Sequence, residues 1–386
     1  NKTREEDPVL IFNRTSRSNP LANFRKGDLA LVYPCTAQDQ PLRHQLFKGV
    51  IVGYDQEQVQ VRLRAKQFND SIFTTFPNWN IEHDVLDSSF SGLYRSLFAF
   101  TGFPLPARQR FMTLKPPVQP VLRSWNPVAQ MTSEQNRIMQ KIISAQDYFL
   151  LWGPPGTGKT SIMLRYLVDY LLHQTTDQLL IMAYTNRAVD EICMALKSLP
   201  GEPDFLRIGS RYATHPDYAS HLLRNRVESI SQRSEMRKLI SDQRLIVGTI
   251  ASVQGKPELF ELKEFDRVII DEATQVLEPV LAGLMPRFKQ VLLIGDHKQL
   301  PAVVTQPSSQ RSVQDESLLS VGLKDLGNSY FERVYERCRQ EGWHWAYDRL
   351  VQQGRMHRDI MEFPSRMFYN NMLETLPLDT ETGRLQ

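Results

Sequence analysis

A glycine-rich stretch limits the possible folds of this 386-residue chain more than any other part of its sequence. It reads Gly153-Pro154-Pro155-Gly156-Thr157-Gly158-Lys159-Thr160 and has the spacing G-x4-G-K-[ST]. It lies between an apolar run, 148–152, and an amphipathic helix that begins near Ser161, which is the setting that a phosphate-binding loop requires. In such loops the backbone N–H groups and the helix N-terminus surround phosphate oxygens, while the lysine reaches the β and γ phosphates. A glycine-rich turn that only caps a helix is the alternative.

From residue 122 to about residue 350, short apolar runs alternate with amphipathic helices. This alternation predicts an α/β fold with a parallel sheet flanked by helices. The predicted strands are 148–152, 179–184, 205–208, 245–247, 268–270 and 291–294. We also expect a helix over 218–240, whose basic residues are typical of a solvated helix face.

The pattern before this region is different. Apolar residues alternate with polar ones over 59–64, and earlier strands are expected at 29–33 and 47–54. We therefore predict a small antiparallel β-barrel or sandwich over 23–86, after a polar N-terminal segment over 1–22. Over 87–121 we expect a stalk helix and then a linker, in which five prolines prevent regular structure.

Two adjacent acidic residues follow the predicted strand 268–270, at the end where α/β sheets place their ligands. A site for Mg²⁺ and a triphosphate needs a carboxylate for the metal and a base for the attacking water. Asp271 would hold Mg²⁺ together with Thr160, and Glu272 would polarise the water. An acidic pair on a protein surface is the alternative, but the presence of Lys159 favours the catalytic interpretation.

Composition narrows the class of protein. The 46 Lys and Arg residues against 43 Asp and Glu residues give a net charge of +3, so a strongly basic wrapping protein is excluded and any nucleic-acid contact must be local. The three cysteines are far apart and fit neither a disulfide framework nor a zinc site. No apolar stretch approaches the roughly eighteen residues of a membrane span. We therefore expect an intracellular, reducing location, in the cytoplasm or in a eukaryotic nucleus, and no membrane partner.

The acidic pair belongs to Asp271-Glu272-Ala273-Thr274-Gln275, which resembles the DEAxQ box of superfamily 1 helicases. Gly295-Asp296-His297-Lys298-Gln299-Leu300-Pro301 is similar to motif III of that family. Other motifs of the family are matched in order by 131–135 (the Q motif), 183–190 (motif Ia), 247–252, and 353–358 with 363–365 (motif IV). The set, which covers about 125–369, resembles superfamily 1B, the 5′-to-3′ branch of the nonsense-decay RNA helicase and the replication nuclease-helicase.

The resemblance implies a RecA-like ATP-binding lobe over 122–350, with ATP and Mg²⁺ as cofactors. It implies that Gln135 reads the adenine edge, that Gln299 senses the γ-phosphate and that Arg355 stabilises transferring charge. The alternatives are a surface helix residue for Gln135 and a turn residue for Gln299. Two residues depart from the family. Gly354 replaces a tyrosine that stacks on adenine, so base stacking is weak or comes from another side chain, and Arg358 replaces a proline.

Four residues at predicted strand ends are candidates for nucleic-acid contact: Thr185, Asn186, Thr249 and Ser252. Hydroxyl and amide groups can hold a single-strand backbone without reading bases. The same residue types also serve as ordinary helix N-caps, which is the alternative. The barrel and stalk resemble the inserted 1B barrel of the branch, and 79–84 and 88–95 resemble the nuclease-helicase group in particular. This likeness favours single-stranded DNA over RNA.

We therefore expect an ATP-dependent helicase or translocase motor, a DNA helicase with 5′-to-3′ polarity acting as a monomer. An RNA helicase of the same branch, an ATPase that remodels complexes without unwinding, and a binding module with a decayed ATPase are the alternatives. The region 351–386 is interpreted as the motif IV region and the start of a second lobe. Because most of that lobe and an initial Met are missing, we expect a fragment that is weakly active or inactive alone, with a nuclease domain possible upstream in the same chain.

Overall fold

A computed structural model gives the structure of the protein. The residues it describes are 9–15, 18–19, 24–35, 44–55, 57–65, 67, 71–84, 88–304 and 306–376, without the side chains of 88–91. The chain divides into two compact units, Asn1–Ser91 and Gly92–Gln386. The boundary falls inside helix α2 (Ser88–Thr101), the stalk helix expected from the sequence, rather than before it.

The first unit is built on an antiparallel sheet with the strand order β1-β4-β3-β2-β5. Its strands are β1 (Val9–Asn13), β2 (Leu29–Pro34), β3 (Phe47–Tyr54), β4 (Gln58–Leu63) and β5 (Trp79–His83), and a short helix, α1 (Ser71–Thr75), precedes β5. The sequence did not predict β1, which lies inside the stretch interpreted as a polar N-terminal segment. This strand pairs with β4, and its Leu10 and Phe12 pack against the core of the sheet.

The first unit is an open, barrel-like sheet rather than a closed barrel. Among the described residues, β1 and β5 form no hydrogen-bonded ladder with each other. Their side chains nevertheless meet, because the rings of Phe12 on β1 and Trp79 on β5 lie 6.0 Å apart. Phe47 and Phe73 complete this aromatic group, which fills the space between the two edge strands.

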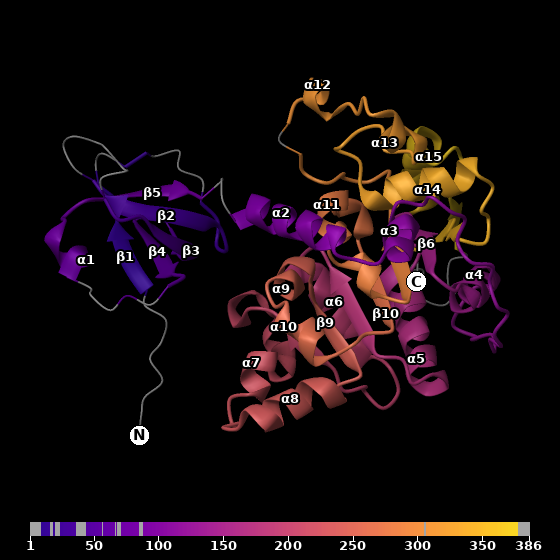
Figure 1. Cartoon of the computed structure of the whole chain (residues 1–386), viewed down its shortest axis with the longest axis horizontal. Coiled ribbons are helices and arrows are strands. Elements are labelled where there is room, and N and C mark those ends of the chain that lie inside the picture. Colours follow the sequence, from indigo (N-terminus) through magenta and orange to yellow (C-terminus); the bar gives the residue numbers. More distant parts are fainter. Residues whose placement is uncertain are drawn as a thin grey trace. The chain divides into compact units, whose positions relative to one another are not determined.

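The second unit contains a parallel sheet of seven strands in the order β12-β6-β11-β10-β7-β9-β8 (Figure 1). Its strands are β6 (Tyr148–Trp152), β7 (Leu179–Ala183), β8 (Leu206–Ile208), β9 (Leu245–Thr249), β10 (Arg267–Asp271), β11 (Gln290–Gly295) and β12 (Tyr347–Arg349). The six strands expected from the sequence are confirmed. The seventh, β12, was missed because it is short, polar and only partly buried, so it lacks the apolar run of a buried parallel strand.

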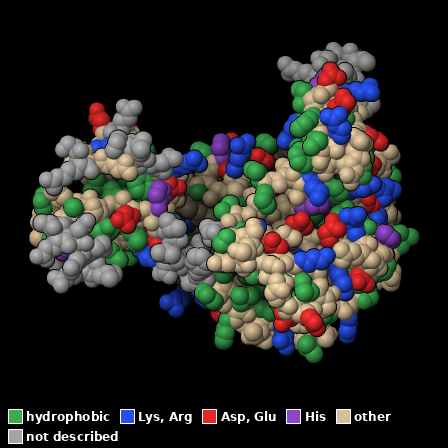
Figure 2. Space-filling model, turned by 90° about the horizontal axis from the view of Figure 1, so that it is seen from above, with side chains coloured by type: hydrophobic (Ala, Val, Ile, Leu, Met, Phe, Trp, Pro, Cys, Tyr) green, Lys and Arg blue, Asp and Glu red, His purple; other side chains and the backbone are tan. Residues whose placement is uncertain are grey.

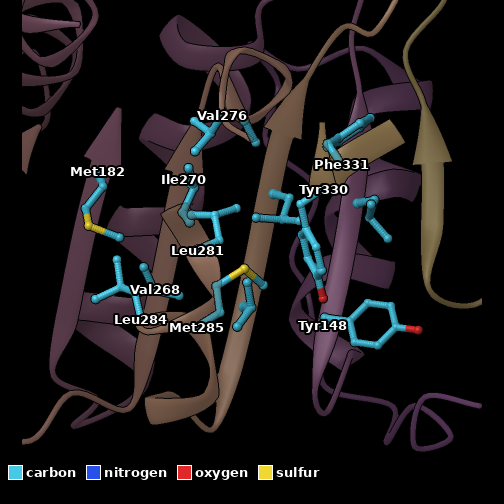
Figure 3. Packing of buried hydrophobic residues seen from close by; sticks show 14 of the residues in the cluster. Tyr148, Met182, Val268, Ile270, Val276, Leu281, Leu284, Met285, Tyr330 and Phe331 are labelled. Atoms are coloured by element: carbon cyan, nitrogen blue, oxygen red, sulfur yellow. The ribbon is translucent and has the colours of Figure 1, made fainter. Parts of the chain in front are cut away.

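Successive residues of the central strands point into two different cores. In β6, Tyr148 and Leu150 belong to the cluster on one face of the sheet, and Phe149 and Leu151 to the cluster on the other. A strand that is buried on both faces reads as a continuous apolar run, which explains why these strands could be predicted. Figure 3 shows part of the first cluster, with Ile270 of β10 beside Leu281.

Helices cover both faces of the sheet. One face packs against α4 (Ser133–Ser144), α5 (Arg165–Gln174) and α6 (Asn186–Lys197). The other face packs against segments that include α9 (Ile250–Gln254), α10 (Glu258–Leu262), α11 (Glu278–Ala282) and α14 (Tyr330–Gln340). The remaining helices are α3 (Leu105–Phe111), α7 (Leu223–Arg226), α8 (Arg233–Asp242), α12 (Ser308–Arg311), α13 (Glu316–Ser320) and α15 (Arg358–Phe368), and a two-stranded ladder joins β13 (Gln352–Gln353) and β14 (Glu374–Thr375).

Two expectations about helices were wrong. The proline-rich stretch contains α3, because Pro104 is its N-cap and Pro106 lies in its first turn, where a missing N–H breaks no helical bond. The helix expected over 218–240 is instead a 3₁₀ segment (Pro216–His221) followed by α7 and α8. Between α7 and α8 the β-branched and serine residues of 227–232 interrupt the helix.

Within the second unit, one serine of the stalk helix packs closely against the end of α11. Ser96 of α2 accepts a hydrogen bond from the N–H of Gly283 at 2.8 Å and donates one to the carbonyl of Val280 at 3.1 Å. A Cβ at position 283 would lie 2.6 Å from the carbonyl oxygen of Ser96, so only glycine fits there. Among the described residues, none of the helices combines the length and the apolar composition that crossing a bilayer demands.

The region 351–386 was interpreted as the start of a second lobe, and its described part packs on the first. Met361, Tyr369 and Leu373 belong to the hydrophobic cluster on one face of the seven-stranded sheet. Residues 377–386 lie outside the described residues. The described part of this region, 351–376, is called the C-terminal segment below.

A buried ion pair ties α14 to α11. Arg333 is 3% exposed and donates two hydrogen bonds of 2.7 Å to the carboxylate of Glu278. Its guanidinium also donates to the carbonyls of Phe111 at 3.2 Å and Val321 at 3.0 Å. The pair therefore joins α11, α14 and the end of α3.

Replacing Glu278 by Gln is expected to destabilise the second unit by about 3–5 kcal/mol, because it leaves Arg333 buried without a countercharge. Urea denaturation followed by circular dichroism measures the loss. Glu336→Gln is the matched control, because Glu336 pairs with Arg339 on the exposed side of the same helix and an exposed pair contributes at most about 1 kcal/mol. Equal losses in the two variants would contradict the prediction.

Candidate nucleotide site

The glycine-rich loop follows β6 and leads into a π-helical turn, Lys159–Leu164. Gly156 and Gly158 have φ values of 79° and 80°, which side-chain-bearing residues adopt only with strain. Gly153 is needed for a different reason, since a Cβ there would lie 2.4 Å from Cγ of Lys159. The Lys159 ammonium donates to the carbonyl of Gly153, so its side chain folds back over the loop.

Thr160 and Asp271 meet at the centre of the site, as the sequence predicts for a metal site. The hydroxyl of Thr160 donates to Oδ2 of Asp271 at 2.6 Å. Asp271 is 1% exposed, and burial raises the pKa of its carboxyl, whereas the Thr160 hydrogen bond and Lys159 lower it. A divalent cation would add to the positive charge of Lys159 near this buried carboxylate. Two oxygen donors next to a phosphate-binding loop fit Mg²⁺, which keeps most of its water ligands.

Glu272 is adjacent but has a different environment. It has a left-handed backbone with φ of 52°, an uncommon conformation for a residue other than glycine. This conformation ends β10 abruptly and turns the chain into the next segment. Burial raises the pKa of the Glu272 carboxyl, Lys159 lowers it, and the nearby carboxylates of Asp271 and Asp296 raise it again. A carboxylate with a raised pKa is suited to accept a proton.

Gln299 is held by a buried carboxylate at the end of β11. Its Nε2 donates to Oδ2 of Asp296 at 2.8 Å. Asp296 is fully buried and accepts three further hydrogen bonds, from Nε1 of Trp152 at 2.8 Å, the N–H of Lys298 at 3.1 Å and the hydroxyl of Tyr369 at 2.7 Å. The side chain of Gln299 is therefore oriented by the protein, which a free turn residue would not be.

Gln135 is connected to the glycine-rich loop. Its backbone and side chain form a capping box with Thr132 at the start of α4, and its Nε2 donates to the carbonyl of Thr157 at 3.2 Å. The residue is only 5% exposed, so it is not a surface helix residue. One amide hydrogen has no partner among the described residues. The adenine-reading role stays a prediction.

The C-terminal segment touches the same loop. The N–H of Gly354 donates to the carbonyl of Gly156 at 3.0 Å, and a Cβ on Gly156 would lie 2.4 Å from Cβ of Arg355. The buried side chain of Gln353 shapes this turn, because its Oε1 accepts from the N–H groups of Arg355 at 2.9 Å and Met356 at 2.7 Å. Arg355 itself is exposed beside the loop.

Comparison with known proteins identifies the family of the chain. Two family models, each described as an AAA domain, match the chain, one over 130–237 and 223–307 and the other over 326–384. The chain contains a superfamily 1 helicase domain. It is 26% identical over 378 residues, 94% of its length, to the DNA replication ATP-dependent helicase/nuclease DNA2 of Xenopus laevis. It is 28% identical over 307 residues, 76% of its length, to the DNA replication ATP-dependent helicase/nuclease JHS1 of Arabidopsis thaliana.

This helicase domain spans 33% and 21% of the lengths of those two relatives. A solved structure described as Arterivirus nonstructural protein 10 (helicase) with DNA resembles it with a TM-score of 0.34 and 16% sequence identity. The likeness covers 60% of this chain and 41% of that one.

The four candidate nucleic-acid residues of the helicase domain include two N-caps. Thr185 caps α6 by accepting from the N–H of Ala188 at 3.1 Å, and Thr249 caps α9 by accepting from the N–H of Ser252 at 3.1 Å. Ser252 also accepts a hydrogen bond from the Thr249 hydroxyl. Asn186 is the first residue of α6. The alternative interpretation as N-caps therefore holds for both threonines, and contact with a nucleic acid stays a prediction for all four.

Sequence reasoning missed two residues that contact motif III of the helicase domain. Trp152 and Tyr369 both donate to Asp296, although 144 and 73 residues separate them from it. The carboxylate of Asp296 lies inside the quoted motif and had no assigned role. No local pattern links the three residues, so their contact could only come from the fold.

Replacing Gly153 by Ala is expected to weaken nucleotide binding of the helicase domain by about tenfold or more, because the new Cβ displaces the Lys159 side chain. Titration with a fluorescent ATP analogue measures the affinity. Gly92→Ala is the control, since a Cβ there meets nothing within 4 Å and alanine suits a helix better than glycine. Unchanged affinity in Gly153→Ala would contradict the described position of Lys159.

The rate of ATP hydrolysis is expected to fall at acid pH, with an inflection above 4.5, the ordinary pKa of a glutamate, because burial raises the pKa of Glu272. The active form is the carboxylate, so activity is present above this raised pKa and is lost as pH falls through it. The rate of hydrolysis at saturating Mg²⁺ and ATP, measured from pH 4 to pH 8, gives the inflection. An inflection that persists in Glu272→Gln belongs to another group and would remove Glu272 from this role.

Proposed function

We propose that the chain is the ATP-binding lobe of a motor that moves along single-stranded DNA and unwinds duplexes with 5′-to-3′ polarity. The observation that carries this proposal is the convergence of Lys159, the Thr160–Asp271 pair, Glu272 and Gln299 around one loop at the carboxyl edge of the parallel sheet. A surface acidic pair or a plain glycine-rich turn has no reason to assemble these groups.

Each group has a defined task in this proposal. The loop N–H groups and Lys159 bind the triphosphate, and Thr160 with Asp271 would hold Mg²⁺, which neutralises phosphate charge when bound. Glu272 accepts a proton from the attacking water. Gln299 contacts the γ-phosphate, and Arg355, exposed beside Gly156, stabilises the transferring group. A decayed ATPase would not be expected to keep all of these groups in place.

We propose DNA as the nucleic acid along which the motor moves, because both relatives above are named as DNA replication helicase/nucleases. The motor activity further requires a second lobe that closes on the ATP and carries part of the strand groove. The net charge of +3 favours local contact with nucleic acid over a broad basic surface. On the face seen in Figure 2, Lys and Arg side chains are interspersed with Asp and Glu, and no broad area of described residues has a single sign.

Lys159→Ala is expected to lower DNA-stimulated ATP hydrolysis by the complete protein about a hundredfold or more, because it removes the cation that binds the reacting phosphates. A coupled phosphate-release assay measures hydrolysis, and Lys115→Ala, which changes an exposed lysine, is the control. If the Lys159→Ala variant kept full DNA-stimulated ATP hydrolysis, the assignment of Lys159 as the phosphate-binding cation would be wrong.

Strand displacement by the complete protein separates the motor classes. Displacement of a strand from substrates with a 5′ overhang supports the proposed polarity, whereas displacement only from 3′ overhangs overturns it. ATP hydrolysis and translocation without strand displacement would instead identify a remodelling ATPase. Stimulation by RNA but not by DNA would identify an RNA motor.

A further inference from the structure

The hydrogen bonds of Asp296 connect the C-terminal segment to the residue proposed to contact the γ-phosphate. Oδ1 of Asp296 is fixed by two donors of its own lobe, the indole of Trp152 and the N–H of Lys298. Oδ2 is shared by two others, Nε2 of Gln299 at 2.8 Å and the hydroxyl of Tyr369 at 2.7 Å. Tyr369 and Gln299 therefore bind the same oxygen atom.

Tyr369 is placed on this oxygen by the local fold of its segment. It is the C-cap of α15, and its N–H donates to the carbonyl of Ser365. The next two residues, Asn370 and Asn371, have φ values of 52° and 58°, and the N–H of Asn371 also donates to that carbonyl at 2.9 Å. This pair of left-handed residues ends the helix and returns the chain to β14. The tyrosine ring is 4% exposed and lies 6.1 Å from Trp152.

The tyrosine can act only as a donor here. Burial raises the pKa of its hydroxyl well above the ordinary range, and the hydrogen bond to Asp296 raises it further. Asp296 is fully buried, so bulk solvent does not reach it to replace a lost donor. Oδ2 has two donors, so removal of the hydroxyl leaves the Gln299 N–H as its remaining one. A buried acceptor that has lost a donor is costly, so Asp296 then holds the Gln299 amide more strongly toward itself.

We propose that Tyr369 is a positioning residue for Gln299, acting through Asp296 to keep the Gln299 amide turned toward the γ-phosphate. The inference rests on the proposed ATP-driven function and adds to it a residue of the C-terminal segment. Arg355 lies on the same segment, so a movement of this segment would change the arginine and the orientation of Gln299 together.

The test compares the affinities for a non-hydrolysable ATP analogue and for ADP, because only the analogue carries a γ-phosphate. Four forms of the complete protein are titrated with fluorescent nucleotides: wild type, Tyr369→Phe, Gln299→Ala and the double variant. We expect the ratio of the two affinities to fall about tenfold in Tyr369→Phe, with ADP affinity unchanged. In the Gln299→Ala background the tyrosine change should have no further effect, because residues that act through one another are not additive.

Tyr335→Phe is the matched control. Its ring also packs on Trp152, at 5.5 Å, but its hydroxyl has no hydrogen bond to Asp296 among the described contacts. This variant should keep the wild-type ratio. Circular dichroism confirms that each variant folds, and Tyr369→Phe keeps the buried ring in place.

An unchanged ratio in Tyr369→Phe, or an equal further loss in the Gln299→Ala background, would overturn the positioning role while leaving the proposed function standing. A wild-type protein that binds neither nucleotide would overturn the proposed function and this inference with it. The rate of DNA-stimulated ATP hydrolysis provides a second readout. It should fall about tenfold in Tyr369→Phe without a matching rise in KM, because Lys159 still binds the phosphates.

Discussion

Four neighbouring parallel strands, β6, β11, β10 and β7, end together at one edge of the sheet, and each is followed by polar residues of the site or its surroundings. The register sets this alignment: Gly295 of β11 is level with Trp152 of β6, and Asp271 of β10 is level with Ala183 of β7. The N–H of Gly153 then donates to the carbonyl of Gly295 at 3.0 Å, which joins the glycine-rich loop to motif III. Parallel pairing therefore brings together groups that are more than a hundred residues apart in the chain.

Much of the second unit could be predicted because its strands are buried on both faces. Such strands show as unbroken apolar runs, and polar residues that follow them must lie at the carboxyl edge. The exceptions have physical causes. β12 is a three-residue edge strand, Tyr347–Arg349, and its pairing with β6 rather than an apolar pattern defines it. In the first unit, β1 is short, and its four apolar residues, Val9–Phe12, lie in an otherwise polar stretch and show no alternation of apolar and polar residues, so the period-two criterion did not detect it.

The site was predictable to the extent that its chemistry is local in sequence. The loop, the acidic pair and motif III are short patterns in which each residue type has a chemical reason. These patterns cannot show which residues from elsewhere in the chain contact the site residues. Thr185 and Thr249 look the same in sequence whether they cap a helix or hold a strand of DNA, and only the structure shows that both are caps. Asp296 gains two of its four donors from residues with no sequence signal.

The glycine at position 354 shows how the C-terminal segment can be positioned without the stacking tyrosine of related motifs. Its contact with the loop is made by the backbone, from the N–H of Gly354 to the carbonyl of Gly156, and so it does not depend on a side chain. The turn around it is shaped by the fully buried Gln353, and its other end is anchored by Tyr369 on Asp296. The C-terminal segment is therefore positioned by its contacts with the glycine-rich loop and with Asp296. We therefore expect the absence of a base-stacking ring at this position to affect recognition of an adenine base, and not the groups proposed to bind the phosphates.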